Sequence, residues 1–281
     1  MNEQHNDVKY KKELLDLLRR VDKILSGYGI EYFAVYGTCL GAVREKGIIP
    51  WDDDVDIAVR RCDFLRALKV LTDSEEQIYA GDRTNIPGCP GRCGRIFNRV
   101  KPDSSLERKR AYIDLHIIDY APASKIWFAW LVLWYVGISR ILERRNGKQY
   151  NSHKVLYTIA DIFALPFRLL SNHALQRFAD WLYMSESPSS YVKITFDGNR
   201  KRYPAIAFCK AERMSFGGMF LPVPVGYDEY LTLCYGDWRT PPPLDGRYSH
   251  AYDRTGVKWT VPTPGDDVRR FLSNNKTEMF K

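Results

Sequence analysis

The segment over residues 36–59, YGTCLGAVREKGIIPWDDDVDIAV, constrains the fold of this chain more than any other feature. It places four carboxylates within five positions, directly before an apolar run. Like charges at this spacing repel one another and raise one another's pKa. A soluble fold does not need such a cluster, so we expect a positively charged group to bind there. The four acids are Asp52, Asp53, Asp54 and Asp56.

The acidic run leads into a predicted β-strand over residues 55–59. Because side chains in a strand alternate between two faces, we expect Asp54 and Asp56 on one face, about 6 to 7 Å apart, and Val55 and Ile57 in the core. Two carboxylates at this spacing can share Mg2+, which proteins bind through one or two carboxylates together with substrate phosphates. A third carboxylate from a neighbouring strand would complete the site.

The sequence AYIDLHIIDY, residues 111–120, supplies that third acid. Asp114 lies between apolar residues on a predicted strand that is otherwise core. By alternation His116 shares the face of Asp114, either as a base or ligand or as a hydrogen-bonded structural histidine. Gly37 and Thr38 form a turn in which backbone N–H groups and a hydroxyl can approach a phosphate.

The first 120 residues alternate between helical and strand patterns, which indicates a sheet domain of the α/β or α+β class; we favour α+β. Helices are predicted over residues 8–27 and 64–71, and short strands over residues 32–36, 77–80, 95–100 and 112–118.

The charge balance favours an anionic partner. The 281 residues include 42 Lys and Arg and 34 Asp and Glu, a net charge of +8. This suits a nucleotide, a phosphorylated lipid or an anionic membrane surface. Nucleic acid fits the charge equally well, but the sequence has no zinc-finger spacing, RNP motif or basic leucine pattern, so we expect no nucleic-acid partner. The GxxxxGK[ST] and GxGxxG motifs of ordinary ATP and NAD sites are also absent from the sequence.

The N-terminal residues MNEQHNDVKYKK are polar and lack the apolar core of a signal peptide. We therefore expect a cytoplasmic protein with reduced cysteines. Of six cysteines, only Cys89 and Cys93 are close, as C-x3-C. A structural zinc site usually needs C-x2-C pairs and two further ligands, so a glycine-rich loop is the simpler interpretation and zinc the alternative.

The composition becomes strongly apolar after residue 120. Residues 126–138, IWFAWLVLWYVGI, carry no charge and hold three of the seven tryptophans. Basic residues follow, and a second apolar stretch covers residues 155–170. Both runs are shorter than the roughly 20 residues that span a bilayer, and Trp beside Lys and Arg favours the headgroup boundary. We expect a helical hairpin lying on the inner face of the membrane; a buried hairpin and a true span remain alternatives.

Three regions are therefore expected along the chain. Residues 1–120 form the catalytic core, residues 121–190 the apolar helical region, and residues 191–281 a segment that completes the donor or acceptor site.

Three motifs together resemble a known family. An apolar-Gly-Thr turn, then D-apolar-D-apolar, then a lone Asp on an apolar strand is similar to the nucleotidyltransferase fold. The longer stretch GTCLGAVREKGIIPWDDDVDI resembles the signature of the LicD family, which includes bacterial phosphocholine transferases and fukutin-related proteins. IDLHIID and LPVPVGYDEYLTLCYGDWRTPPP are similar to further segments of that family, so the resemblance reaches from about Tyr32 to Pro243.

The resemblance implies a nucleotidyltransferase-type mixed sheet with flanking helices, into which the apolar hairpin is inserted. It also implies an enzyme, dependent on Mg2+ or Mn2+, that transfers a phospho-alcohol such as phosphocholine from a CDP-activated donor. The acceptor would be a sugar of a cell-surface or lipid-linked glycan (lipopolysaccharide, teichoic acid or capsule), and CMP would leave. Asp54, Asp56 and Asp114 would bind the metal, and Asp114 is also placed to take the proton of the acceptor hydroxyl.

Further roles follow from the same resemblance. Asp52 and Asp53 would lie behind the metal ligands or bind a second ion. Phosphate or substrate contacts are expected from Gly37, Thr38, Arg44, Arg95, Arg99, His116 and, with the weakest argument, His250. His116 departs from the family, which tends to have an apolar residue at that position.

Four other interpretations stay open at this point. In the first, the chain is a nucleotidyltransferase that uses a nucleoside triphosphate. In the second, it is a non-catalytic accessory protein of glycan synthesis at the membrane. A calcium loop would use Asp52, Asp54, Asp56 and Asp63, but Ile57 occupies the position where an EF-hand needs glycine. A solvated acidic loop would leave the Gly-Thr turn and Asp114 unexplained.

Overall fold

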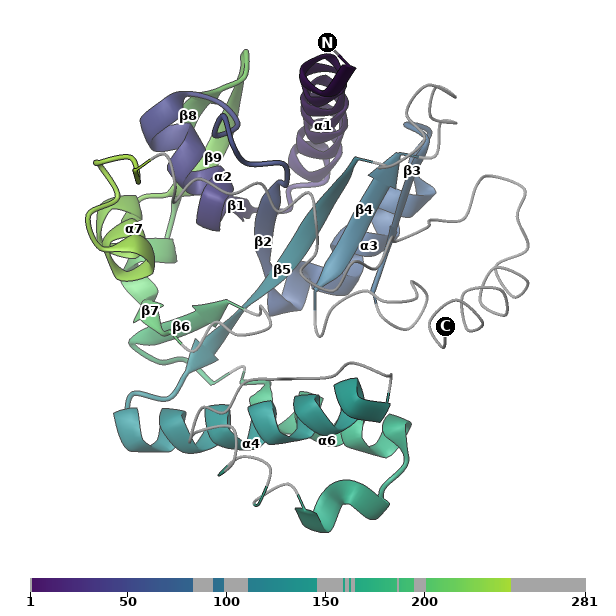
Figure 1. Ribbon diagram of the computed structural model, residues 1–281, viewed down its shortest axis with the longest axis vertical. Helices are drawn as coiled ribbons and strands as arrows, with labels where there is room; N and C mark the ends of the chain where they lie inside the picture. The colour runs from purple at the N-terminus through teal and green to yellow at the C-terminus, as the bar shows by residue number, and fades with distance from the viewer. Residues whose placement is uncertain are drawn as a thin grey trace.

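A long strand, β5 (Tyr112–Ala121), organises the sheet of this protein (Figure 1). Strand β2 (Asp56–Arg60) runs parallel to its first half, and β4 (Gly94–Asn98) pairs antiparallel on the other side. Edge strands β1 (Tyr32–Ala34) and β3 (Ile78–Gly81) give the order β1-β2-β5-β4-β3. Strand β6 (Tyr191–Ile194) pairs with the second half of β5, and β7 (Tyr203–Pro204) pairs with β6. The computed structural model describes residues 2–82, 93–98, 111–145, 159, 162, 165–185, 187–194 and 201–243.

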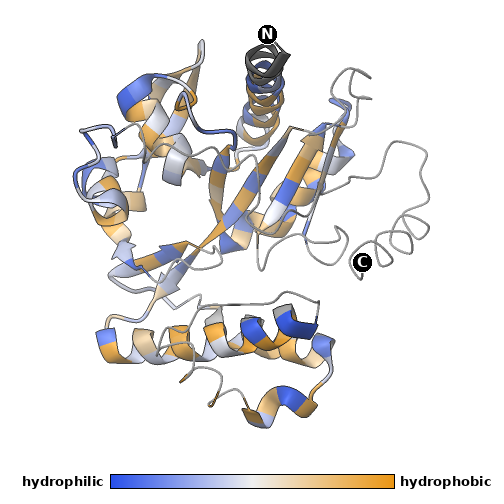
Figure 2. Cartoon of the chain, in the orientation of Figure 1, coloured by the Kyte–Doolittle hydropathy of each residue, from blue (hydrophilic) through white to orange (hydrophobic). Residues whose placement is uncertain are grey.

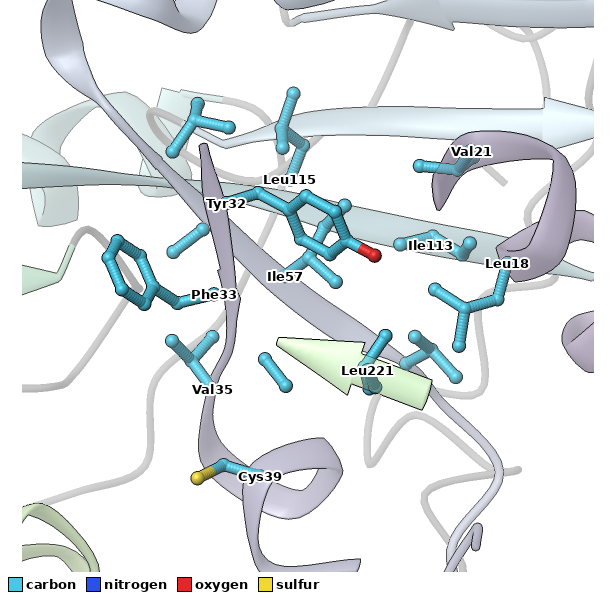
Figure 3. Close-up of a cluster of buried hydrophobic side chains, with 14 of the residues drawn as sticks. Leu18, Val21, Tyr32, Phe33, Val35, Cys39, Ile57, Ile113, Leu115 and Leu221 are labelled. Carbon is cyan, nitrogen blue, oxygen red and sulfur yellow. The ribbon is translucent and has the colours of Figure 1, made fainter. Parts of the chain in front are cut away.

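Two helices supply the core on one face of this sheet. In α1 (Asn2–Gly27), Leu18 and Val21 face the same side as the other buried leucines of the helix because three or four residues make about one turn. They pack near Ile57, Ile113 and Leu115 from β2 and β5 (Figure 3). Helix α3 (Arg61–Asp73) contacts the same two strands. The mixed α+β architecture that the sequence predicts is therefore confirmed.

The C-terminal described segment packs into the same core as the N-terminal sheet. It comprises η3 (Ala205–Phe208), the hairpin β8 (Ala211–Phe216) and β9 (Met219–Pro224), and α7 (Tyr227–Tyr235). Figure 1 shows these elements beside β1, and β9 contacts β1 directly. The ring of Phe208 lies 5.6 Å from Phe33 of β1 and 5.1 Å from Tyr230 of α7, measured between centroids.

A helical lobe lies at the far end of β5, below the sheet in Figure 1. It consists of α4 (Lys125–Arg145), η2 (Leu165–Leu169) and α6 (Asn172–Tyr183). Among the described helices, α4 alone is long and apolar enough to cross a membrane, over Lys125–Leu142. Residues 121–190 contain the helices that the sequence predicts. Much of the second apolar stretch, residues 155–170, lies outside the described residues. Membrane association remains a prediction.

Two predicted strand boundaries are wrong next to the acidic run. The first strand ends at Ala34, because Tyr36 has φ of 48° and begins the short helix α2 (Tyr36–Leu40). The second strand begins at Asp56, and residues 52–55 form irregular chain. Strand alternation therefore does not determine the direction of Asp54, although it does apply to Asp56.

Candidate active site

Two acids from adjacent strands form the centre of the site. Asp56 is the first residue of β2, and its register partner on the parallel strand β5 is Asp114. Neighbouring strands lie about 4.8 Å apart, and register partners point to the same face. Both residues are buried. The sequence predicted that these carboxylates would converge from two strands, and the register brings their backbones side by side.

The turn before α2 holds this strand end in place. The hydroxyl oxygen of Thr38 accepts a hydrogen bond from the backbone N–H of Asp56 at 2.8 Å. A Cβ atom on Gly37 would overlap the Oδ2 atom of Asp52, so a larger residue would require the Asp52 carboxylate to move. The predicted Gly-Thr turn therefore lies against the acidic run. Contact of either residue with a phosphate remains a prediction.

Each central acid also contacts a cationic or titratable side chain. Arg95 Nε donates to Asp114 Oδ1 at 2.7 Å, and its guanidinium lies 4.4 Å from the ring centroid of Tyr112. His116 Nε2 lies 2.9 Å from Asp56 Oδ1, and the His116 ring is edge-on to Tyr36 at 5.4 Å. The predicted shared face of Asp114 and His116 is consistent with this arrangement. Arg95 and His116 are buried partners of the acids here, and their expected contact with substrate stays a prediction.

Burial and crowding raise the pKa of the acids. For Asp54, burial raises the pKa most, and the negative charges of Asp56 and Asp52 and a hydrogen bond with Asp52 add to the increase. For Asp114, burial raises the pKa and Asp56 adds to the increase, whereas Arg95 and His116 oppose it. Both acids therefore favour a bound cation or a proton more than a surface aspartate does.

Two tyrosines that the sequence analysis did not select lie in the field of these acids. Burial is the main cause of the raised pKa of Tyr10 in α1 and of Tyr112 in β5, and Asp53, Asp54 and Asp114 contribute to both. Their phenols therefore stay neutral at physiological pH. No sequence pattern pointed to them, because Tyr10 occupies an ordinary apolar position of an amphipathic helix.

Arg44 connects the acidic segment with the C-terminal segment. It belongs to η1 (Gly41–Glu45), a single π-helical turn, and its Nη1 donates to the backbone oxygen of Trp238 at 2.7 Å. Its Nη2 atom and the Nε1 atom of Trp238 are buried without a hydrogen-bond partner within the described part of the chain. Buried donors of this kind are usually satisfied, so both suit an acceptor that the structure does not contain. The sequence analysis selected Arg44 and missed Trp238.

Several predicted residues receive no structural test. Arg99, His250 and Cys89 lie outside the described residues, so their predicted roles stay open. Cys93 is buried beside Phe97, and the structure contains no test of a C-x3-C zinc site.

Two of the alternative interpretations do not fit the structure. Asp53 and Asp56 are buried, which contradicts a solvated acidic loop. Residues Asp56–Arg60 form a sheet strand, which is incompatible with a continuous calcium loop from Asp52 to Asp63. Across the described ranges, no group of three or more His, Cys, Asp or Glu side chains is arranged to hold a metal ion. The predicted metal site therefore remains a prediction built on two paired strands.

Comparison with known proteins agrees with the geometry. Residues 29–129 match the family model for the LicD/FKTN/FKRP nucleotidyltransferase domain. A lipopolysaccharide cholinephosphotransferase, LicD, of Haemophilus influenzae is 24% identical over 244 residues, which cover 84% of this chain and 92% of that protein. An uncharacterised protein of Rickettsia typhi is 35% identical over 85 residues, 30% of this chain and 28% of that protein.

A ribitol-5-phosphate transferase, FKTN, of Mus musculus is 38% identical over 50 residues, which cover 18% of this chain and 11% of that protein. The acidic motifs, the paired strands β2 and β5 and the family match all fall within residues 29–129. Through this nucleotidyltransferase domain, the chain belongs to the LicD family.

Proposed function

We propose that this protein transfers a phospho-alcohol from a CDP-activated donor to a hydroxyl of a cell-surface glycan and releases CMP. The observation that carries the proposal is the register pairing of Asp56 with Asp114 inside the matched domain. The names of two relatives, a cholinephosphotransferase and a ribitol-5-phosphate transferase, support the class of group transferred. The identity of the alcohol and of the acceptor sugar is left open by this proposal.

A divalent cation fits the chemistry of the acidic residues. Asp54, Asp56 and Asp114 would hold Mg2+ or Mn2+, since Mg2+ needs only one or two carboxylates when substrate phosphates complete its shell. Burial and, after it, the neighbouring carboxylates raise the pKa of Asp54 and Asp114, and a nearby cation would offset both effects. When bound, the cation would neutralise charge on the donor diphosphate and on the departing CMP.

The protein's own groups would bind the donor diphosphate. Arg44 has a buried Nη2 donor that suits a phosphate oxygen, and Arg is well matched to such groups. The hydroxyl of Thr38 accepts a bond from Asp56, and a hydroxyl in that role can still donate its own proton. Because Thr38 and Asp56 are hydrogen-bonded, donor phosphate and acidic centre would lie next to each other.

The transfer itself would be a substitution at phosphorus. The acceptor hydroxyl oxygen would form a bond to the phosphorus that carries the alcohol, while the bond from that phosphorus to the oxygen of CMP breaks. Asp114 would take the hydroxyl proton, and CMP would leave with the bonding electrons. The burial of Asp56 and Asp114 would help to keep water from competing with the acceptor.

The function is tested by incubating the purified protein with Mg2+, a glycan acceptor, and CDP-choline or CDP-ribitol. Release of CMP with labelling of the glycan supports the proposal, and Asp114→Asn removes it. Asp73→Asn, at an exposed acid on α3, serves as the matched control and keeps full activity.

Two other outcomes identify the rival functions. Release of pyrophosphate from a nucleoside triphosphate identifies a nucleotidyltransferase instead. Neither product across a broad donor panel identifies an accessory protein without catalysis. Independently of turnover, Mg2+ is expected to raise the melting temperature of the wild type and not that of Asp56→Asn with Asp114→Asn.

A further inference from the structure

Helix α4 has two apolar faces, and both contact the rest of the protein over part of their length. Phe128 and Val132 pack beside Ala121 and Tyr191 at the ends of β5 and β6. Ile138 and Ile141 pack against Leu175 and Ala179 of α6. Burial on these two faces accounts for much of the apolar character of the helix.

The N-terminal half of the face that packs on α6 further along the helix is apolar and exposed. Ile126, Trp127 and Trp130 are exposed by 75%, 59% and 43%, and Trp134 continues the same stripe one turn later. Successive residues are rotated by about 100° in an α-helix, so this stripe lies roughly opposite Phe128 and Val132. The stripe is therefore directed away from the sheet.

A chain of ring contacts extends this stripe across the lobe. Trp134 lies edge-on to Phe167 of η2 at 5.4 Å, Phe167 stacks on Phe178 of α6 at 5.0 Å, and Phe178 stacks on Trp181 at 5.8 Å. Figure 1 shows η2 on the side of α4 and α6 that is remote from the sheet. Around these rings, Trp181 is exposed by 72% and Leu169 by 95%.

We call this surface the outer face and define it by six exposed residues. They are Ile126, Trp127, Trp130, Leu165, Leu169 and Trp181. Figure 2 shows hydrophobic colouring on α4 and η2 together with hydrophilic turns. A contiguous exposed apolar surface with a polar rim is typical of a protein or membrane contact.

The helical lobe has an excess of positive charge in its sequence. Residues 125–185 contain eight Lys and Arg and three Asp and Glu. Among the described residues of the lobe, the exposed cations are Lys125, Arg144, Arg145, Arg168 and Arg177, of which Lys125 directly precedes Ile126 and Arg168 directly precedes Leu169. Arg145 donates to the backbone oxygen of Leu170 and to Asn172 Oδ1, which ties the end of α4 to the connection between η2 and α6.

We infer that the outer face docks on an anionic lipid bilayer, with its tryptophans and leucines at the headgroup boundary. Trp favours that boundary, and Lys and Arg next to it are attracted to anionic headgroups. A second copy of this chain would bring the same positive charge to the contact and be repelled. A transmembrane position is disfavoured because α4 packs on the sheet domain through Phe128 and Val132 and on α6 through Ile138 and Ile141. The inference does not depend on the proposed transferase activity.

Sedimentation with lipid vesicles tests this inference on the full chain. We expect binding to vesicles of phosphatidylcholine with phosphatidylglycerol, and much weaker binding to phosphatidylcholine alone or at high salt. The double variant Trp127→Ser with Leu169→Ser removes two apolar side chains that would be buried in the bilayer and should weaken binding at least about tenfold. The matched control, Leu65→Ser with Phe220→Ser, changes two comparably exposed residues of the sheet domain and should bind like the wild type.

A second pair of variants tests the charge. Lys125→Gln with Arg168→Gln should weaken binding to anionic vesicles about tenfold, whereas Lys12→Gln with Lys210→Gln should leave it unchanged. Equal vesicle binding by all variants would overturn the inference. So would light scattering that shows a dimer without lipid, lost in Trp127→Ser with Leu169→Ser, because the outer face would then join two copies of the chain.

Discussion

The acidic site and the outer face of the helical lobe both depart from the usual pattern, in which charged side chains are exposed and large apolar side chains are buried. At the site, charged side chains are buried and hydrogen-bonded: Asp114 to Arg95, and Asp56 to His116. On the outer face, large apolar side chains such as Trp127 and Leu169 are exposed to solvent. Both arrangements reduce stability relative to ordinary packing. The comparison teaches that the two proposed functional surfaces have separate physical origins, one electrostatic and one hydrophobic.

The largest expected effect tests the electrostatic region. Asp56→Ala should reduce transfer at least about a thousandfold, because it removes a carboxylate from the paired centre. CMP release measures the effect, and circular dichroism confirms that the variant is folded. Asp73→Asn is the control for loss of one negative charge at the surface. Near-normal activity of a folded Asp56→Ala variant would contradict the assignment of the site.

A second prediction compares a buried ion pair with a surface pair. Arg95→Met leaves Asp114 buried without its partner and should lower the free energy of unfolding by about 3 to 5 kcal/mol. Arg213→Gln, which removes the more exposed partner of Asp22, should cost no more than about 1 kcal/mol. Urea unfolding measures both. Similar losses in the two variants would mean that burial does not distinguish these ion pairs.

The third prediction concerns the close approach at Gly37. Gly37→Ala places a methyl group against Asp52, forces that carboxylate out of its position and should destabilise the protein by about 0.5 to 1.5 kcal/mol. Asp52→Ala in the same chain should recover most of that loss, because it removes the clashing carboxylate. Thermal unfolding of the single and double variants checks this, and a double variant as unstable as Gly37→Ala would assign the strain elsewhere.

The fourth prediction is a pH dependence caused by Asp54. Its folded-state pKa is raised, so the protonated acid stabilises the fold below its unfolded pKa of about 3.9, and this contribution is lost as the pH rises through the folded pKa. Asp54→Asn should therefore be more stable than the wild type at neutral pH, with a smaller difference in acid. Urea unfolding at both pH values, without divalent cations, provides the measurement. A variant less stable than the wild type at neutral pH would show that the cluster is not repulsive.

The smallest expected effect belongs to the hydrophobic region. Trp127→Ser alone should change the free energy of unfolding by no more than about 0.5 kcal/mol, since its side chain is largely exposed. Phe128→Ser, at the neighbouring buried position, should cost several times more. Thermal unfolding separates the two. Equal losses would mean that Trp127 supports the fold, and the contrast between outer and inner faces of α4 would fail.

The sequence predicted the site where strand periodicity applies. Asp114 lies on a regular strand, and its position between apolar residues marked it as a candidate site residue. Strand alternation therefore applies to it, and its register partner on β2 is Asp56. The same periodicity failed for Asp54, because the acidic run stays irregular until Asp56. It also failed at the end of the first strand, where Tyr36 turns the chain with a positive φ. Local patterns cannot show such a turn, because it is stabilised by a distant group: the backbone N–H of Tyr36 donates to the hydroxyl of Tyr230.

Contacts between distant segments were also beyond sequence reasoning. The family resemblance included the YGDW segment. No sequence spacing indicated that the backbone oxygen of Trp238 would accept a hydrogen bond from Arg44, which lies 194 positions away in the chain. The pairing of Arg95 with Asp114 depends on β4 and β5 being antiparallel neighbours with these residues in register. Helical periodicity did predict α1, because its buried stripe is encoded locally.

The length of β5 has a consequence for the reach of the enzyme. This single strand runs from Asp114 at the acidic centre to Ala121, directly before the helical lobe. Seven steps of about 3.3 Å separate these residues by roughly 23 Å along the strand. With the lobe bound to a bilayer, β5 would hold the reacting phosphorus at a fixed distance from the lipid. An acceptor anchored in that bilayer would need a headgroup long enough to reach across this distance.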